Sequence, residues 1–92
     1  MTLKELINQP GRTLLDVRSQ EEFQSFHVSG SINMPVNEIP AHLDEIKSFS
    51  KPLIIYCLSG GRSSSAVAYL EAQGINEIYN AGAVSDVHLV SI

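Results

Sequence analysis

Two residue types that often build functional sites are scarce in this chain, which has one cysteine, Cys57, and no tryptophan. A single cysteine excludes an internal disulfide and leaves too few sulfur ligands for a structural zinc site. The three histidines, His27, His42 and His88, are too far apart in sequence to suggest a pair of metal ligands. The sequence therefore predicts no metal site and no cofactor.

Positive charge is also scarce, with six Lys and Arg against ten Asp and Glu and a net charge of −4 at pH 7. Most of the cations stand singly, so the chain has no basic stripe for nucleic acid or an anionic membrane face. No apolar run approaches the roughly 20 residues of a membrane span, and the N-terminus lacks the pattern of a secretory signal. We expect a cytoplasmic protein as the chain is written, or a periplasmic one if a signal peptide was removed from a longer precursor.

The composition that remains is typical of a globular domain, with 92 residues of which 43% are apolar and 17% are charged. We expect one domain over residues 1–92. Apolar spacing and turn residues predict helices at 2–8, after Ser19, at 37–49 with Asn37 as cap, and at 62–73; strands at 13–17, 31–34, 53–56 and 77–80; and no regular element from Gly82 onward. Thr2 with Glu5 and Ser19 with Glu22 have the spacing of capping boxes at the starts of the first two helices. Strands separated by helices predict an α/β fold with a central, mainly parallel sheet flanked by helices.

Cys57 directly follows the apolar run LIIY, which is typical of a central parallel strand buried on both faces. Ligands of such sheets bind beyond the carboxyl ends of the strands. A free thiol has a pKa of about 8.5 and is mostly protonated at neutral pH. Gly60 and Gly61 allow the loop to curl so that backbone N–H groups converge on the sulfur, and the start of the following helix adds partial positive charge. We therefore expect a lowered Cys57 pKa and a nucleophilic role.

Arg62 stands five residues after Cys57, at the mouth of the predicted loop. Its guanidinium adds a fixed positive charge and a planar set of donors, so the site is suited to anions. Ser63, Ser64 and Ser65 either cap the helix or donate hydroxyl groups into the loop, and we favour capping.

Three segments, LLDVRSQEEF, HVSGSINMP and YCLSGGRS, occur in this order along the chain. Together they resemble the first-strand segment, the histidine-containing turn and the active-site loop of the rhodanese family, over nearly the full length. The resemblance implies a three-layer domain and a sulfurtransferase reaction. In that reaction Cys57 takes sulfane sulfur from thiosulfate or a similar donor as a persulfide, and passes it to cyanide or a thiol acceptor.

The same resemblance implies the roles of individual residues. Cys57 is the nucleophile and persulfide carrier, and Arg62 assists it by binding the anionic donor. The substrate-binding loop consists of Leu58, Ser59, Gly60, Gly61, Arg62 and Ser63. The supporting residues are Asp16 and Arg18, which match the family's DVR signature. Glu22 and His27 also match family positions, and all four residues are interpreted as structural.

The chain departs from the family pattern at several positions. Many rhodanese domains have paired glycines followed by a tryptophan, whereas this chain has Gly82, then Ala83, and no tryptophan. These features are similar to the phage shock protein E type of the family. Phe26 and Ser29 stand where the family often has glycine and proline, which affects the geometry of the turn around His27.

Two alternatives are left open by the residues. Cys-based phosphatases and arsenate reductases use a similar thiolate, amide loop and arginine, but with five residues between Cys and Arg, whereas Cys57 and Arg62 are separated by four. A non-catalytic binding module is the other alternative, because fold does not fix function. The expected partners are a small sulfur-donor anion, a thiol or cyanide acceptor and a thiol protein, without nucleic acid.

Overall fold

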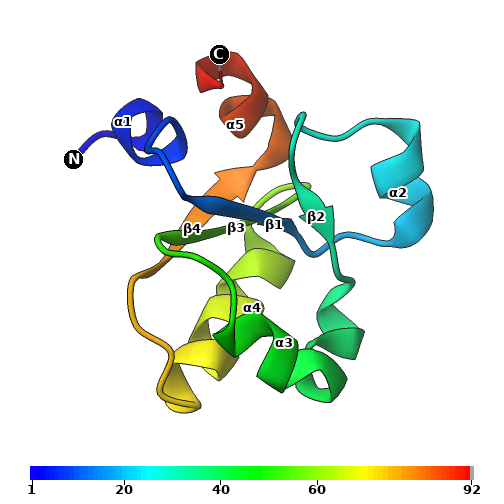
Figure 1. The fold of residues 1–92 in the computed structure, drawn as a ribbon. Helices are drawn as coiled ribbons and strands as arrows, with labels where there is room; N and C mark the ends of the chain where they lie inside the picture. The colour runs from blue at the N-terminus through cyan, green and yellow to red at the C-terminus, as the bar shows by residue number, and fades with distance from the viewer. Residues whose placement is uncertain (92) are drawn as a thin grey trace.

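The computed structural model describes residues 1–91 and contains a four-stranded parallel sheet in the order β2-β1-β3-β4 (Figure 1). The central strands are β1 (Thr13–Asp16) and β3 (Leu53–Cys57), and the edge strands are β2 (Ile32–Asn33) and β4 (Ile78–Ala83). Every residue of β1 and β3 is buried, as expected for strands covered on both faces. The predicted α/β fold with a parallel sheet is confirmed.

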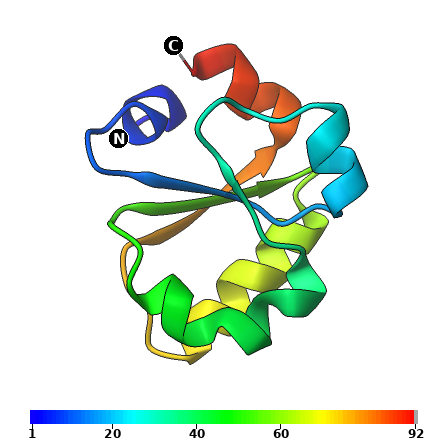
Figure 2. The same cartoon turned by 45° about the vertical axis from the view of Figure 1, so that its right-hand side comes forward.

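Helices cover the two faces of this sheet and make three layers (Figures 1 and 2). One outer layer contains α1 (Leu3–Ile7) and α5 (Val84–Val90). The other contains the 3-10 helix η1 (Val36–His42), α3 (Leu43–Lys47) and α4 (Gly61–Ala72). The remaining helix, α2 (Gln20–Ser25), lies to the side of the sheet, beyond β2. No helix within residues 1–91 has the length and apolarity that crossing a membrane requires.

Side chains along each strand point alternately to the two faces of the sheet, so the core consists of two clusters of buried side chains. The cluster on the α1 and α5 side includes Ile54 and Tyr56 of β3. The cluster on the α4 side includes Ile55 and Cys57 of the same strand, together with Leu70 of α4. Successive residues of a strand point to opposite faces, so the position of Cys57 in β3 directs its sulfur toward α4.

The short helices α1 and α2 begin with the predicted capping boxes. At α2, the backbone N–H of Ser19 donates to Glu22 Oε1 at 3.0 Å, and the N–H of Glu22 donates to Ser19 Oγ at 3.2 Å. Such reciprocal bonds satisfy two of the backbone donors left free at a helix start. They also hold the Glu22 side chain at the N-terminal end of α2.

The prediction of a single helix at 37–49 with Asn37 as its cap was wrong. The segment forms η1 and then α3, η1 begins after Pro35, and neither helix has a side-chain cap. Pro40 contributes no amide hydrogen and disfavours the α conformation at the residue before it. The segment therefore begins as the 3-10 helix η1, and an α-helix forms only from Leu43 onward.

The prediction of no regular structure from Gly82 onward was also wrong. Strand β4 continues through Gly82 to Ala83, and α5 follows directly. Val84 and Val87 of α5 are buried against the sheet, and Val90 packs on the same cluster. This three-residue spacing is a helical signal, but it spans only two turns and has no side-chain cap, so it does not stand out in the sequence.

Candidate active site

Cys57 is the last residue of β3, and its side chain is 1% exposed. The position and the burial of Cys57 follow from the sequence, because the residues before it form an apolar strand and the residues after it form a turn. The sulfur lies at the carboxyl end of the sheet and points toward the first turn of α4. The predicted location of the thiol is confirmed.

The loop after Cys57 turns back on the sulfur at Gly60. Gly60 has a φ of 106°, a left-handed conformation that favours glycine, and it is the N-cap residue of α4. Its backbone N–H donates to Cys57 Sγ at 3.0 Å. Leu58 is 55% exposed, so the loop before Gly60 forms the outer rim of the site.

Ser63, in the first turn of α4, supplies further contacts to the sulfur. Its backbone N–H lies 3.4 Å from Cys57 Sγ, and its hydroxyl oxygen lies 3.4 Å from the same atom. The side chain is fully buried and α4 has no side-chain cap, so the interpretation of Ser63 as a helix cap was wrong. Gly60 has no side chain that could accept from the first turn of α4, and Cys57 Sγ accepts from the Ser63 N–H instead, while the Ser63 hydroxyl lies between the thiol and Asn80.

These contacts decide the acidity of the thiol. Burial raises the pKa of Cys57, but hydrogen bonds from the Ser63 hydroxyl and from the amides of Ser63, Gly60 and Ser59 outweigh burial, so the net pKa is lowered. The predicted direction is confirmed. The cause lies in the loop and the first turn of α4, and Arg62 donates no hydrogen bond to Cys57 Sγ in the described structure.

Arg62 instead forms a two-pronged ion pair with Glu22 of α2. Its Nη1 lies 2.6 Å from Glu22 Oε1 and its Nη2 lies 3.0 Å from Glu22 Oε2. This pair, together with the bond from Ser19, lowers the pKa of Glu22 to about 2. Glu22 was interpreted as structural from the sequence. Its carboxylate binds the guanidinium of Arg62, which was predicted to bind an anionic donor.

Asp16 and Arg18 form a second, buried ion pair at the end of β1. Arg18 Nη2 lies 2.8 Å from Asp16 Oδ2, and the N–H of Arg18 donates to Asp16 Oδ1 at 3.0 Å. Arg18 Nη2 also donates to the carbonyl of Phe26 at 2.5 Å, which ties the turn after α2 to the sheet. His27 stacks on Phe23, with ring centroids 3.7 Å apart. These contacts place Asp16 and Arg18 in a buried brace and His27 against α2, and their structural roles stay predictions.

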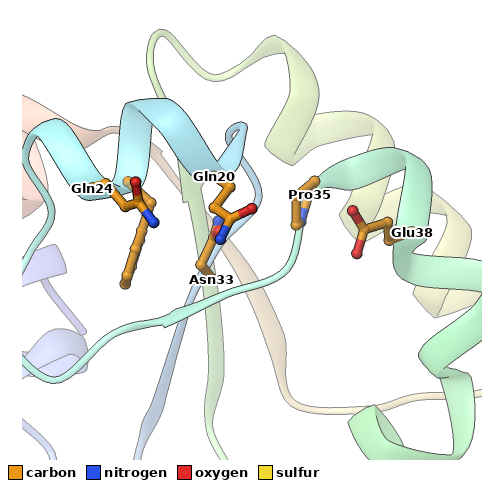
Figure 3. A pocket seen from close by; sticks show the side chains of 6 residues that line it. Gln20, Gln24, Asn33, Pro35 and Glu38 are labelled. Atoms are coloured by element: carbon orange, nitrogen blue, oxygen red, sulfur yellow. The ribbon is translucent and has the colours of Figure 1, made fainter.

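A groove runs from Arg62 between α2 and η1, and we call it the α2–η1 groove. It consists of two adjoining pockets of about 360 and 440 Å³ that share Gln20, Pro35 and Glu38. Arg62 lines the first pocket, and Gln24 and Asn33 line the second. Figure 3 shows the amide side chains of Gln20 and Gln24 beneath α2, opposite the segment that carries Asn33 and Pro35. The groove is lined by both polar and apolar residues and lies beside the arginine of the site.

Asn80 of β4 is part of the site and was not anticipated from the sequence. Its Oδ1 lies 2.7 Å from the Ser63 hydroxyl oxygen, which in turn contacts the thiol. The residue stands seventeen positions after Ser63. Only the pairing of β4 beside β3 brings the two together, and no local pattern marks it.

Within residues 1–91, no group of three or more His, Cys, Asp or Glu side chains is arranged to hold a metal ion. What the site offers chemically is a buried thiol of lowered pKa, amide donors around its sulfur and an arginine nearby. Such a site can form a thiolate and stabilise negative charge on a group attached to it.

Comparison with known proteins agrees with this geometry. Residues 2–85 match the family model described as Rhodanese-like domain. Thiosulfate sulfurtransferase GlpE of Pseudomonas syringae is 34% identical over 80% of this chain and 69% of its own length. Thiosulfate sulfurtransferase PspE of Escherichia coli is 29% identical over 85% of this chain and 76% of its own length. A solved structure described as rhodanese with anions from E. coli superimposes with a TM-score of 0.73 at 31% identity, covering 82% of this chain and 89% of that one. The fold, the thiol loop and these similarities show that the chain belongs to the rhodanese family.

Proposed function

We propose that this protein is a thiosulfate sulfurtransferase that carries sulfane sulfur as a persulfide on Cys57. The observation that carries the proposal is the geometry around the sulfur, where Gly60 and Ser63 direct N–H groups to Cys57 Sγ at 3.0 and 3.4 Å. The names of the relatives GlpE and PspE support the choice of thiosulfate as donor.

In the first step the Cys57 thiolate attacks the outer, sulfane sulfur of thiosulfate. A new S–S bond forms to Cys57, the S–S bond of thiosulfate breaks, and sulfite leaves with the electron pair. The product is a persulfide anion on the enzyme. Amide donors of the loop from Leu58 to Ser63 stabilise this anion, because preorganised N–H groups lose little free energy by reorganising as charge develops.

In the second step a nucleophile attacks the terminal sulfur of the persulfide. The sulfur leaves on the acceptor, the Cys57–sulfur bond breaks, and the thiolate is restored. Cyanide gives thiocyanate, whereas a thiol gives a new persulfide. This double displacement requires no external oxidant, because each step is a nucleophilic substitution at sulfur and the acceptor takes up the sulfur atom that the donor gives.

Arg62 is proposed to attract the anionic donor, in competition with Glu22. The guanidinium is about one third exposed and borders the α2–η1 groove. Leu58 and Ser59 form the exposed rim through which the donor reaches the sulfur. Asp16 and Arg18 hold the turn after α2 at the end of β1 and act as supports.

The α2–η1 groove is proposed to hold a thiol acceptor. Amide side chains such as those of Gln20 and Gln24 can donate to and accept from the peptide groups of a small peptide thiol. The groove ends at Arg62, in the first turn of the helix whose Ser63 contacts the thiol. Cyanide is too small to need this surface.

A steady-state assay tests the proposal. The wild-type protein and Cys57→Ser are supplied with thiosulfate and cyanide, and thiocyanate is measured; the wild type turns over and the variant does not. Release of phosphate from an aryl phosphate by the wild type, without thiocyanate, would favour a phosphatase. Absence of both products would favour a binding module.

A further inference from the structure

The hydroxyl group of Ser63 faces more acceptors than it has protons. Its oxygen lies 2.7 Å from Asn80 Oδ1, 3.1 Å from the Gly60 carbonyl oxygen and 3.4 Å from Cys57 Sγ. A serine hydroxyl carries one hydrogen and can donate it to one strong acceptor at a time. Asn80 Oδ1 is the nearest of these acceptors, and the Gly60 carbonyl, which also accepts from the N–H of Ser64 at 2.9 Å, lies farther away. The competition that depends on the state of Cys57 is the one between Asn80 and the sulfur.

The backbone of β4 decides which atom of the Asn80 amide faces Ser63. The N–H of Gly82 lies 2.9 Å from Asn80 Oδ1, and a backbone N–H can only donate. The atom between Gly82 and Ser63 is therefore the amide oxygen, which is an acceptor. It follows that the 2.7 Å contact uses the Ser63 proton.

This direction of the hydroxyl depends on the state of Cys57. When Ser63 donates to Asn80, its oxygen is free to accept, and the matching form of Cys57 is the neutral thiol donating S–H to Ser63. A thiolate or a persulfide has no such proton, and the sulfur then needs the hydroxyl as a donor. Ionisation of Cys57 therefore turns the Ser63 hydroxyl away from Asn80.

We propose that Asn80 is a positioning residue that competes with the Cys57 sulfur for the single proton of the Ser63 hydroxyl and so favours the neutral thiol in the resting protein. The proposal rests on the nucleophilic role of Cys57 stated above. Asn80 stands on the exposed edge strand β4, so a surface residue controls the ionisation of a buried thiol through one hydroxyl group.

The charged groups around the thiol do not provide an equivalent competition. Four of these groups are already joined in ion pairs. Asp16 at the end of β1 pairs with Arg18, and Glu22 of α2 pairs with Arg62 of α4. α5 packs on β3 and β4 and carries two more groups that can titrate, Asp86 and His88. All six groups are unchanged by substitution at Asn80, so a difference between variants reports on the hydroxyl.

The test is the rate of Cys57 alkylation by iodoacetamide as a function of pH, in the wild type, Asn80→Leu and Asn80→Asp. Leucine is close to asparagine in size, removes the acceptor and shields Ser63 from water, so the midpoint moves down by about half to one pH unit, the size of one hydrogen bond. Aspartate is a stronger acceptor and adds negative charge, so the midpoint moves up. The two substitutions are therefore expected to move the midpoint of Cys57 alkylation in opposite directions.

Ser63→Ala separates action through the hydroxyl from any direct effect. In this background Asn80→Leu leaves the midpoint unchanged, and the upward shift caused by Asn80→Asp shrinks to its through-space charge effect. An unchanged or raised midpoint for Asn80→Leu in the wild-type background would overturn the proposal. A full-sized Asn80→Leu shift without the Ser63 hydroxyl would also overturn it.

Alkylation requires no sulfur donor, so this experiment is independent of the proposed function. A wild type that forms no thiocyanate but shows the opposite shifts would refute the transferase and leave the role of Asn80 standing. Thermal unfolding of each variant is recorded alongside. Asn80 is exposed, so both substitutions are expected to leave the midpoint of unfolding close to that of the wild type.

Discussion

Glu22 of α2 holds both terminal nitrogens of Arg62 of α4, at 2.6 and 3.0 Å, although the two residues are forty positions apart. The arginine nearest the thiol loop is therefore neutralised in the resting protein. A dianionic donor such as thiosulfate meets this carboxylate when it approaches Arg62. The pair makes donor binding a competition, and Glu22 sets its strength.

Glu22→Gln is expected to lower the KM for thiosulfate about two- to fivefold with little change in kcat, because ion pairs this exposed contribute up to about 1 kcal/mol. Glutamine keeps an acceptor for the capping box of α2. The matched control is Glu21→Gln, which removes the same charge from the same helix without touching Arg62. Equal KM values for the two variants would show that Glu22 does not compete with the donor.

The same pair predicts how stability depends on pH. The pKa of Glu22 is lowered from an ordinary 4.5 to about 2 by Arg62 and by the backbone of Ser19. A carboxylate with a depressed pKa stabilises the fold above its unfolded pKa, and this contribution is lost as pH falls from about 4.5 toward 2. Urea unfolding of the wild type and Glu22→Gln should show a gap at pH 6 that narrows by pH 3. A gap that widens on acidification would contradict this assignment.

The glycines of the loop give a stability test with a built-in control. Gly60 has a φ of 106°, so Gly60→Ala is expected to reduce the free energy of unfolding by about 1–2 kcal/mol. Gly61 begins α4, and a Cβ there would meet no atom within 4 Å. Gly61→Ala should therefore be neutral or slightly stabilising, because alanine favours the helix. Urea denaturation of both variants measures the difference, and equal values would contradict a left-handed turn at Gly60.

The α2–η1 groove can be tested by filling it. Gln20→Trp places a large ring between α2 and η1, where Gln20 lines both pockets. With a peptide thiol such as glutathione as acceptor, the KM is expected to rise about tenfold or more. With cyanide as acceptor, the KM for cyanide should stay close to the wild-type value. Equal effects on both acceptors would place the binding of peptide thiols elsewhere.

Much of this fold could be predicted from local sequence. The strand ending at Cys57, the helix after Gly60 and the capping box of Ser19 with Glu22 depend on neighbours within a few residues, and each is present as predicted. The 3-10 helix around Pro40 and the short helix from Val84 were missed, because the first depends on the restrictions of one proline and the second on packing against the sheet.

The same distinction holds for the site. Cys57 and the loop around Gly60 could be identified because they are contiguous. The partner of Arg62 is forty residues away and that of Ser63 is seventeen away, and both contacts exist only after α2 and β4 have docked. The role of Ser63 was misjudged for a related reason, because its N–H donates to Cys57 Sγ and its hydroxyl lies against Asn80 of β4, and neither contact is visible in the residues next to it.

The most direct measurement of the central claim is the intact mass of the protein after treatment with thiosulfate and removal of excess reagent. The account predicts that the wild type gains the mass of one sulfur atom, that cyanide removes this sulfur, and that Cys57→Ser gains nothing. A wild type with no added sulfur, or a Cys57→Ser variant that still gains one, would contradict it.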